Sequence, residues 1–258
     1  MSYLTIREKL LSKSYEILGS NYSIKNNCKL VKKFYPDIKT FVDIGASTGT
    51  FIKGFKREFP NCKIYAFEPV EESFIKLKKD FPEVDSYNLA LGSENKTKVF
   101  FENKSNAEGS NLVGYEETKG YIDNNDIKKQ EINIKRFDDL NISIQSPCFT
   151  KIDTNGYELE VLKGMQNKLK EIDILQVEII FPSFFKRLDG KSKISEIISF
   201  LSNYGFNVFI QQNIHVINGT IAHCDLIFFK DKNWFIHNHL RCLFFQNNSC
   251  TWYTDKSR

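Results

Sequence analysis

Short runs of hydrophobic, β-branched and aromatic residues alternate along the chain with stretches whose hydrophobic residues recur at helical spacing. Gly, Pro, Asn or Asp bounds the runs, a pattern that is typical of β-strands. The predicted strands cover residues 40–45, 63–69, 86–91, 98–103, 148–153, 174–181, 206–210 and 225–230.

The intervening stretches carry hydrophobic residues three or four positions apart, which predicts helices with one buried face. These residues are Phe74, Leu77 and Phe81 in one stretch, Leu159, Leu162, Met165 and Leu169 in a second, and Ile194, Ile197, Ile198 and Leu201 in a third. Strands that alternate with helices form a mostly parallel sheet with helices on both faces. The last two predicted strands have no helix between them, so we expect an antiparallel hairpin at one edge.

The length of 258 residues suits one α/β domain with a continuous core. We expect a helical lead-in over residues 1–38, the α/β domain over residues 39–230 and an aromatic-rich tail over residues 231–258. Residues 104–131 are polar, so we predict a long loop there, and long loops in compact domains often carry function.

The charge balance argues against a dedicated nucleic-acid protein. Thirty-six Lys and Arg face 32 Asp and Glu, so most of the positive charge can be offset locally. No stretch approaches the roughly 18 apolar residues of a membrane-spanning helix, and charged residues interrupt the first 18 positions, where a secretory signal would be apolar. The six cysteines form no CxxC pair, which favours reduced thiols, and we expect a cytoplasmic location.

The most informative motif is VDIGASTGTF, at residues 42–51. A buried strand ends at Asp43, and Gly45 and Gly49 follow before a helix, so a ligand can approach the backbone closely. The spacing departs from the GxGxxG pattern of dinucleotide sites, and a carboxylate at Asp43 would repel a phosphate. It suits a ligand with an ammonium or sulfonium group, and S-adenosylmethionine has both. We therefore predict that the loop binds this cofactor, through Asp43, Gly45, Ala46, Ser47, Gly49 and Phe51.

Two further strand ends complete the predicted cofactor site. Glu68, followed by Pro69, ends the strand after the glycine loop, where an acidic residue accepts hydrogen bonds from ribose hydroxyls. Asn88, Leu89 and Ala90 lie at the end of the third predicted strand, where they can form an apolar wall with one amide beside an adenine. A generic α/β turn with a surface Glu, and an ordinary buried strand end, are the plain alternatives.

The segment FTKIDTNGYELEVLKGM, at residues 149–165, carries the candidate reactive groups. Lys151 and Asp153 lie two positions apart, so their side chains share a face of the strand. Asp153 ends this strand, where it can hold a substrate hydroxyl, act as a base, ligate a divalent metal ion or simply cap the turn. Glu178, inside an apolar strand, is the second catalytic candidate, unless it only pairs with Lys151. Lys151 and Asn155 are predicted to face the substrate.

These motifs, in the order VDIGASTGTF, AFEPV, NLALG, GSNL, RFDDL, KIDTNGYELEVLKG and QVEIIF, resemble the FkbM-type methyltransferase family. The resemblance spans roughly residues 38–182. It implies the Rossmann-like class I methyltransferase fold, an α/β fold whose seven-stranded, mostly parallel sheet has an antiparallel last strand. It also implies O-methylation of a hydroxyl on a sugar, glycan or small natural product, but does not identify the substrate. We expect Ser110 and Asn111 to face the acceptor. Asn155-Gly156 stands where family members often carry Glu-Gly or Gln-Gly.

Several other functions stay open from the residues alone. Enzymes that methylate base amino groups carry Asn or Asp, Pro-Pro and an aromatic residue at this strand end, whereas this chain has Asp153-Thr-Asn-Gly. A nicotinamide dehydrogenase would carry the missing GxGxxG pattern. A non-catalytic protein that binds adenosylmethionine, or a methyltransferase acting on nucleic acid or protein, is the alternative to the predicted enzyme.

Overall fold

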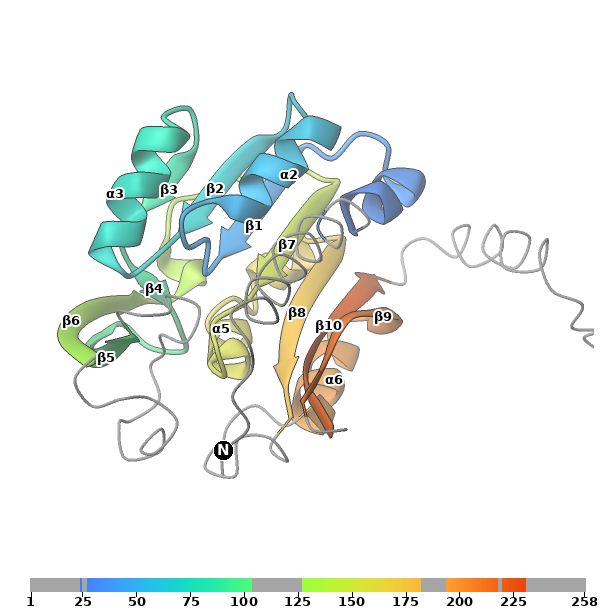
Figure 1. Cartoon of the computed structure of the whole chain (residues 1–258). Helices are drawn as coiled ribbons and strands as arrows, with labels where there is room; N and C mark the ends of the chain where they lie inside the picture. Colours follow the sequence, from blue (N-terminus) through green and yellow to red (C-terminus); the bar gives the residue numbers. More distant parts are fainter. Residues whose placement is uncertain (1–23, 25–26, 104–126, 182–193, 218–219, 231–258) are drawn as a thin grey trace, which may run out of the picture.

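The structure is a computed structural model and describes residue 24 and residues 27–103, 127–181, 194–217 and 220–230 (Figure 1). Ser110 and Asn111, and the expected tail over residues 231–258, lie outside the described residues. The described part of the chain contains no helix that is both long enough and apolar enough to cross a membrane.

A seven-stranded sheet forms the centre of the molecule, in the order β3-β2-β1-β7-β8-β10-β9 (Figure 1). Its strands are β1 (Thr40–Ile44), β2 (Lys63–Phe67), β3 (Asp85–Tyr87), β7 (Cys148–Ile152), β8 (Ile174–Ile180), β9 (Phe206–Ile217) and β10 (Thr220–Lys230). The first five strands of this order are parallel, and β10 pairs antiparallel with β8 and with β9. The predicted sheet, with its antiparallel last strand and terminal hairpin, is therefore confirmed.

Helices cover both faces of this sheet, as predicted. Alternate residues of β1 belong to different cores: Phe41 packs with Phe55 and Phe149, whereas Val42 belongs to the cluster that holds Val161 and Leu201. The first core takes side chains from the helix over residues 27–34, α2 (Thr50–Glu58) and α3 (Glu71–Asp80). The second takes them from α5 (Glu158–Lys163) and α6 (Ile194–Ser202).

A second, three-stranded sheet was not predicted. It consists of β4 (Ala90–Leu91), β6 (Ile127–Lys135) and β5 (Lys96–Asn103), with β6 in the centre. The predicted strand over 86–91 is wrong as one element, because Asn88 and Leu89 separate β3 in the large sheet from β4 in the small one. The loop predicted over 104–131 is also wrong for residues 127–131. They belong to β6, whose run Lys-Lys-Gln-Glu hides the strand pattern although Ile132 and Ile134 are buried.

The helix predicted from Leu159 to Leu169 is interrupted. α5 ends at Lys163, and a short helix, η4 (Lys168–Lys170), follows. The break falls at Gly164, where a Cβ would lie 1.9 Å from the carbonyl oxygen of Gly92. The close approach of the Gly92 backbone thus requires glycine at this position.

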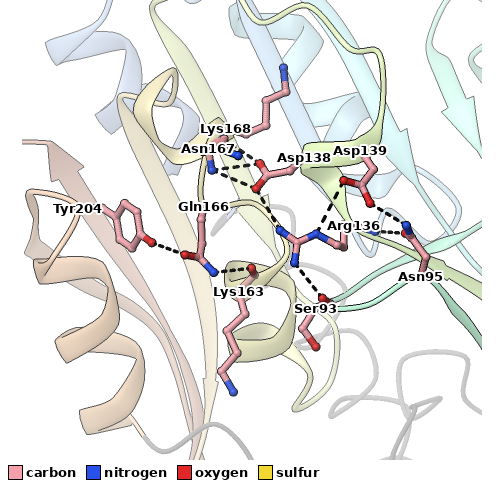
Figure 2. Close-up of polar contacts among 10 residues, drawn as sticks. All are labelled: Ser93, Asn95, Arg136, Asp138, Asp139, Lys163, Gln166, Asn167, Lys168 and Tyr204. Carbon is pink, nitrogen blue, oxygen red and sulfur yellow. Dashed lines mark hydrogen bonds and ion pairs between the residues drawn. The ribbon is translucent and has the colours of Figure 1, made fainter.

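Asp138, in the short helix η3 (Phe137–Asp139), fastens the end of β6 to η4 (Figure 2). Its side chain is 4% exposed, and its carboxylate accepts hydrogen bonds from the backbone N–H groups of Asn167 (3.1 Å) and Lys168 (3.0 Å). The guanidinium of Arg136 lies 3.5 Å away and also donates to the carbonyl oxygen of Ser93 at 3.1 Å (Figure 2). One carboxylate therefore caps η4 and pairs with the small sheet.

We expect Asp138→Ala to lower the free energy of unfolding by about 2 kcal/mol, because it leaves the N–H groups of Asn167 and Lys168, at the start of η4, without their acceptor. Asp139→Ala is the matched control: Asp139 is adjacent, its side chain is 46% exposed, and its ion pair with Arg136 should contribute less than about 1 kcal/mol. Urea denaturation of both variants measures the difference. Equal losses would show that Asp138 does not have this capping role.

Candidate active site

One face of the large sheet changes from hydrophobic to charged toward the carboxyl ends of its parallel strands. Phe41, Phe149 and Ile174 are buried in the hydrophobic core on this face. The residues that follow on the same face, at alternate positions of β1, β7, β8 and β10, are polar: Asp43, Lys151, Gln176, Glu178, His223 and Asp225. Asp43 is paired with Lys151, Lys151 with Gln176, and Glu178 with Asp225 in the sheet register. Asp153 follows β7 directly and joins them.

The glycine loop adopts left-handed backbone angles at every second residue. The φ angles are +81° at Gly45, +49° at Ser47 and +86° at Gly49, which precedes α2. The backbone N–H groups of Gly45 and Ala46 donate to the carbonyl oxygen of Phe67 at 3.0 and 3.1 Å. The loop therefore turns sharply between β1 and α2 while it stays attached to the end of β2.

Gly45 also lets the loop touch the end of β7. A Cβ at this position would lie 1.8 Å from the backbone carbonyl oxygen of Asp153. Because the contact is with backbone, neither side can give way cheaply. The first glycine of the motif thus sets the distance between the predicted cofactor loop and the predicted reactive residue.

We expect Gly45→Ala to lower the free energy of unfolding by about 3 kcal/mol, from left-handed strain plus the clash with Asp153. Gly205→Ala separates the two causes, because Gly205 has φ +78° and nothing within 4 Å of its added Cβ. That control should lose only about 1 kcal/mol. Chemical denaturation of both variants tests the prediction, and similar losses in the two would rule out the clash.

Asp43 is fully buried, and neither of its carboxylate oxygens accepts a hydrogen bond within the described residues. Burial raises its pKa to about 6, although the Lys151 ammonium, whose Nζ lies 3.6 Å from Oδ1, opposes the shift. Buried polar groups without partners are rare in folded proteins and need an explanation. Two unfilled acceptors beside the glycine loop are consistent with a bound ligand that carries an ammonium group or brings ordered water.

Glu68 connects the end of β2 to the glycine loop. Its Oε2 accepts a hydrogen bond from the N–H of Ser47 at 2.7 Å, and its Oε1 accepts one from the N–H of Val70 at 2.8 Å. Burial raises the pKa of Glu68 to about 7, and these two hydrogen bonds oppose the shift. Each oxygen keeps a second lone pair, so the predicted bonds to a ribose remain compatible with this role.

The other predicted cofactor residues lie either in a loop or in the hydrophobic core. The Asn88 amide donates to the carbonyl oxygens of Glu68 (3.0 Å) and Pro69 (3.1 Å), so it fixes the end of β2. Leu89 is half-buried, and Ala90 is buried at the start of β4. Phe51 packs against the rings of Phe41 and Phe149 beneath the ammonium of Lys151, and contributes to the core.

Lys151 joins the cofactor loop to the reactive strand end. Its side chain is 10% exposed, and its Nζ lies 2.9 Å from Oδ2 of Asp153 as well as 3.6 Å from Oδ1 of Asp43. Burial would raise the pKa of Asp153, but the Lys151 ammonium and a hydrogen bond with Glu178 outweigh it and lower the pKa below its usual value. One interpretation of the sequence paired Lys151 with Glu178, but in the structure Lys151 pairs with Asp153 and Asp43. The ammonium group of Lys151 therefore keeps Asp153 ionised.

The pKa of Glu178 is shifted in the opposite direction from the pKa of Asp153. Burial raises its pKa well above the usual value, and the charges of Asp153, Glu158 and Asp225 add to the shift. Its Oε2 is buried without a hydrogen-bond donor in the described residues, and its Oε1 lies 3.4 Å from Nδ1 of His223. Two carboxylates can share a hydrogen bond only if one is protonated, and the directions of the pKa shifts assign this proton to Glu178.

A tight turn holds Asp153 in place. Asn155 and Gly156 have φ angles of +52° and +95°, and Asn is one of the few residues with a side chain that tolerate this region. The buried Oε1 of Glu158 accepts hydrogen bonds from the N–H groups of Thr154 and Gly156, both at 3.0 Å. Glu158 thus fixes the turn, and Asn155 is placed beside Asp153.

The structure brings Asp43, Glu68, Lys151, Asp153 and Glu178 to one edge of the sheet. Sequence reasoning did not place His223 and Asp225 in this site. Asp225 accepts a hydrogen bond from Gln176 at 2.9 Å, and burial raises its pKa to about 7. The signal was present, because polar residues two apart occur in β8 (Gln176, Glu178) and in β10 (His223, Asp225), as they do at Lys151 and Asp153. Among the described residues, no group of three or more His, Cys, Asp or Glu is arranged to hold a metal ion.

The chain matches the profile of a protein family, an individual protein and several solved structures. The profile of the methyltransferase FkbM domain matches residues 43–208, more than half of the chain. Methyltransferase 1 of Beauveria bassiana (strain ARSEF 2860) is 24% identical over 197 residues, which are 69% of this chain and 76% of that protein.

Solved structures with a similar arrangement include two methyltransferases. One is an S-adenosylmethionine-dependent methyltransferase from Clostridium acetobutylicum ATCC 824, with a TM-score of 0.48, 8% identity and coverage of 88% of this chain and 99% of that chain. The other is magnesium protoporphyrin IX methyltransferase from Synechocystis PCC 6803 with bound SAH, with a TM-score of 0.48, 10% identity and 90% coverage of both chains.

Proposed function

We propose that this chain, which belongs to the FkbM methyltransferase domain family, transfers a methyl group from S-adenosylmethionine to a hydroxyl oxygen of a sugar, glycan or small natural product. The family assignment made from the sequence motifs is confirmed, and methyl transfer is the activity of the class. The methyl donor, the hydroxyl acceptor and the roles of individual residues are the proposal.

One observation carries it: Lys151 bridges Asp43, beside the glycine loop, and Asp153, at the reactive strand end. With both acids ionised, these three side chains keep one net negative charge. That charge is buried and poorly screened, so it attracts a cationic ligand and repels a phosphate over several ångströms. The donor sulfonium and ammonium groups match this preference, whereas a dinucleotide pyrophosphate does not.

In the proposed reaction, bound S-adenosylmethionine supplies a methyl group made electrophilic by the attached sulfonium. Asp43, Glu68 and the glycine loop bind and orient the donor. Asp153, held ionised by Lys151, accepts a hydrogen bond from the acceptor hydroxyl and directs its oxygen in line. Removal of the hydroxyl proton by a positioned base contributes about 10²–10⁴-fold to such reactions. Glu178 is placed beside Asp153 to take part in that transfer. The structure offers no ligand set for a divalent ion at Asp153 within the described residues.

The charge of the site favours neutral acceptors. The ionised carboxylates of Asp43 and Asp153 outnumber the one ammonium group, that of Lys151, among these three side chains. A polyanion near these carboxylates would be repelled, which supports a small hydroxyl compound or glycan over nucleic acid. A protein acceptor and a non-catalytic adenosylmethionine-binding role are the alternatives that the test must separate.

The test is formation of S-adenosylhomocysteine from S-adenosylmethionine with a panel of monosaccharides, oligosaccharides, phenols and polyols as acceptors. The proposal predicts acceptor-dependent product formation that requires Asp153, with the new methyl group on oxygen by mass spectrometry and NMR. Binding of the donor without turnover on any acceptor would favour the non-catalytic alternative. The domain boundaries at residues 38 and 230 and the cytoplasmic location stay predictions.

A further inference from the structure

His223 stands on the opposite side of Glu178 from Asp153. β8 lies between β7 and β10, so Asp153, Glu178 and His223 come from three neighbouring strands or their ends. Nδ1 of His223 is 3.4 Å from Oε1 of Glu178, and its side chain is 34% exposed against 12% for Glu178. The imidazole therefore connects a buried carboxyl group to the surface.

The proposed reaction needs such a connection. The Asp153 side chain is 37% exposed, but an acceptor bound to it would cover that carboxylate. Its other neighbours are Lys151, a cation that cannot accept a proton, and Glu178. Ile152 of β7 is paired with Val177 of β8 in the sheet register, so the residues that follow them, Asp153 and Glu178, are neighbours. A proton taken from the acceptor can therefore leave the site through Glu178.

We propose that His223 is the exit for the acceptor's proton, which moves from Asp153 through Glu178 to the imidazole and then to solvent. This inference rests on the proposed function. As the new C–O bond forms, the methyl C–S bond breaks and its electron pair stays on sulfur. The hydroxyl proton passes to Asp153, Asp153 passes a proton to the Glu178 carboxyl group, and Glu178 releases a proton from Oε1 to Nδ1 of His223, so both acids return to their starting protonation states. One proton is released for each methyl group transferred.

His223 acts through Glu178 and is thus a positioning and relay residue rather than a catalytic one. Charged groups from every neighbouring element face this pair: Lys151 and Asp153 from β7 and its end, Glu158 from α5, and Asp225 from β10. β9 places His215 opposite His223 in the strand register. His215 therefore provides a matched control, a second histidine on the same hairpin.

The experiment compares wild type, His223→Gln, His223→Ala and His215→Gln in the S-adenosylhomocysteine assay, with the best acceptor of the panel and with and without added imidazole. We expect both His223 variants to lose about 10- to 100-fold in kcat with KM unchanged. Free imidazole should restore turnover in His223→Ala, because it can occupy the vacated position and carry the proton. His215→Gln should match wild type.

The possible outcomes distinguish a failure of the proposed proton relay from a failure of the proposed methyltransferase activity. If the wild type turns over and both folded His223 variants, checked by thermal melting, stay within twofold of it, the relay is wrong and the proposed function stands. An equal loss of kcat in His215→Gln, or no recovery of kcat in His223→Ala with added imidazole, would also overturn the relay. Either result would show that the loss of kcat comes from a disturbed β9–β10 hairpin and not from a lost proton carrier. If the wild type methylates no acceptor, the proposed function fails and the relay fails with it.

Discussion

Replacing Asp153 by Asn should lower kcat about 1,000-fold, because a lost base typically costs about 10²–10⁴-fold. It should raise the Kd for S-adenosylmethionine less than replacement of Asp43 does, because Asp153 contributes to the negative charge of the site but is proposed to face the acceptor. Asn keeps the size of the side chain, but it cannot take a proton. The change also removes the closest partner of Lys151, whose Nζ is 2.9 Å from Oδ2 of Asp153. Steady-state assays give kcat, and calorimetry gives the Kd.

Glu160→Gln is the control for this variant. Glu160 lies in the first turn of α5, the helix that follows Asp153 in the chain, and pairs with Lys163 at 2.6 Å. It should retain wild-type kcat. Turnover by Asp153→Asn within tenfold of wild type would show that Asp153 is not the base of the reaction.

The second large effect concerns Asp43, where we expect Asp43→Asn to raise the Kd for S-adenosylmethionine about 100-fold. Two opposite charges about 6 Å apart interact by about 3 kcal/mol at an effective dielectric of 20, which is close to this factor. Asn cannot supply the charge, although it fits the same buried space. Calorimetric titration of the variant measures the change.

The same substitution should not destabilise the fold. Burial raises the pKa of Asp43 to about 6 in the folded protein, above its value of about 4 in an unfolded chain. The folded state therefore binds the proton more tightly, so this group favours folding below about pH 4 and opposes it increasingly as the pH rises through 6. At pH 7.5, Asp43→Asn should have an equal or higher free energy of unfolding. Asp37→Asn is the control, because 72% of the Asp37 side chain is exposed. It should change neither the free energy of unfolding nor the Kd for S-adenosylmethionine. A variant that bound the donor normally would show that Asp43 is only structural.

The elements of the large sheet were accessible from the sequence because their burial follows a simple pattern. β1 and β7 are fully buried runs, and β8 is nearly so. β6 was missed because Lys128, Lys129 and Glu131 interrupt a strand that buries one face of a small sheet. The need for glycine at position 164 depends on the backbone of Gly92, a contact between residues far apart in the chain, which no local pattern reveals.

The candidate site could be predicted where it follows one strand and its turn. Asp43, Asp153 and Glu68 lie at strand ends, as their positions in the motifs indicated. The partners of these residues could not be predicted, because they depend on strand order. β10 is last in the sequence but lies between β8 and β9, and this insertion brings His223 and Asp225 to Glu178. Ser110 and Asn111 lie outside the described residues, so their facing the acceptor stays a prediction.

The most direct measurement is calorimetric titration of the wild-type chain with S-adenosylmethionine, S-adenosylhomocysteine and NAD in parallel. A loop that follows the buried Asp43 carboxylate should bind the first two and show no heat with NAD. Binding of NAD without binding of either adenosyl compound would contradict the account.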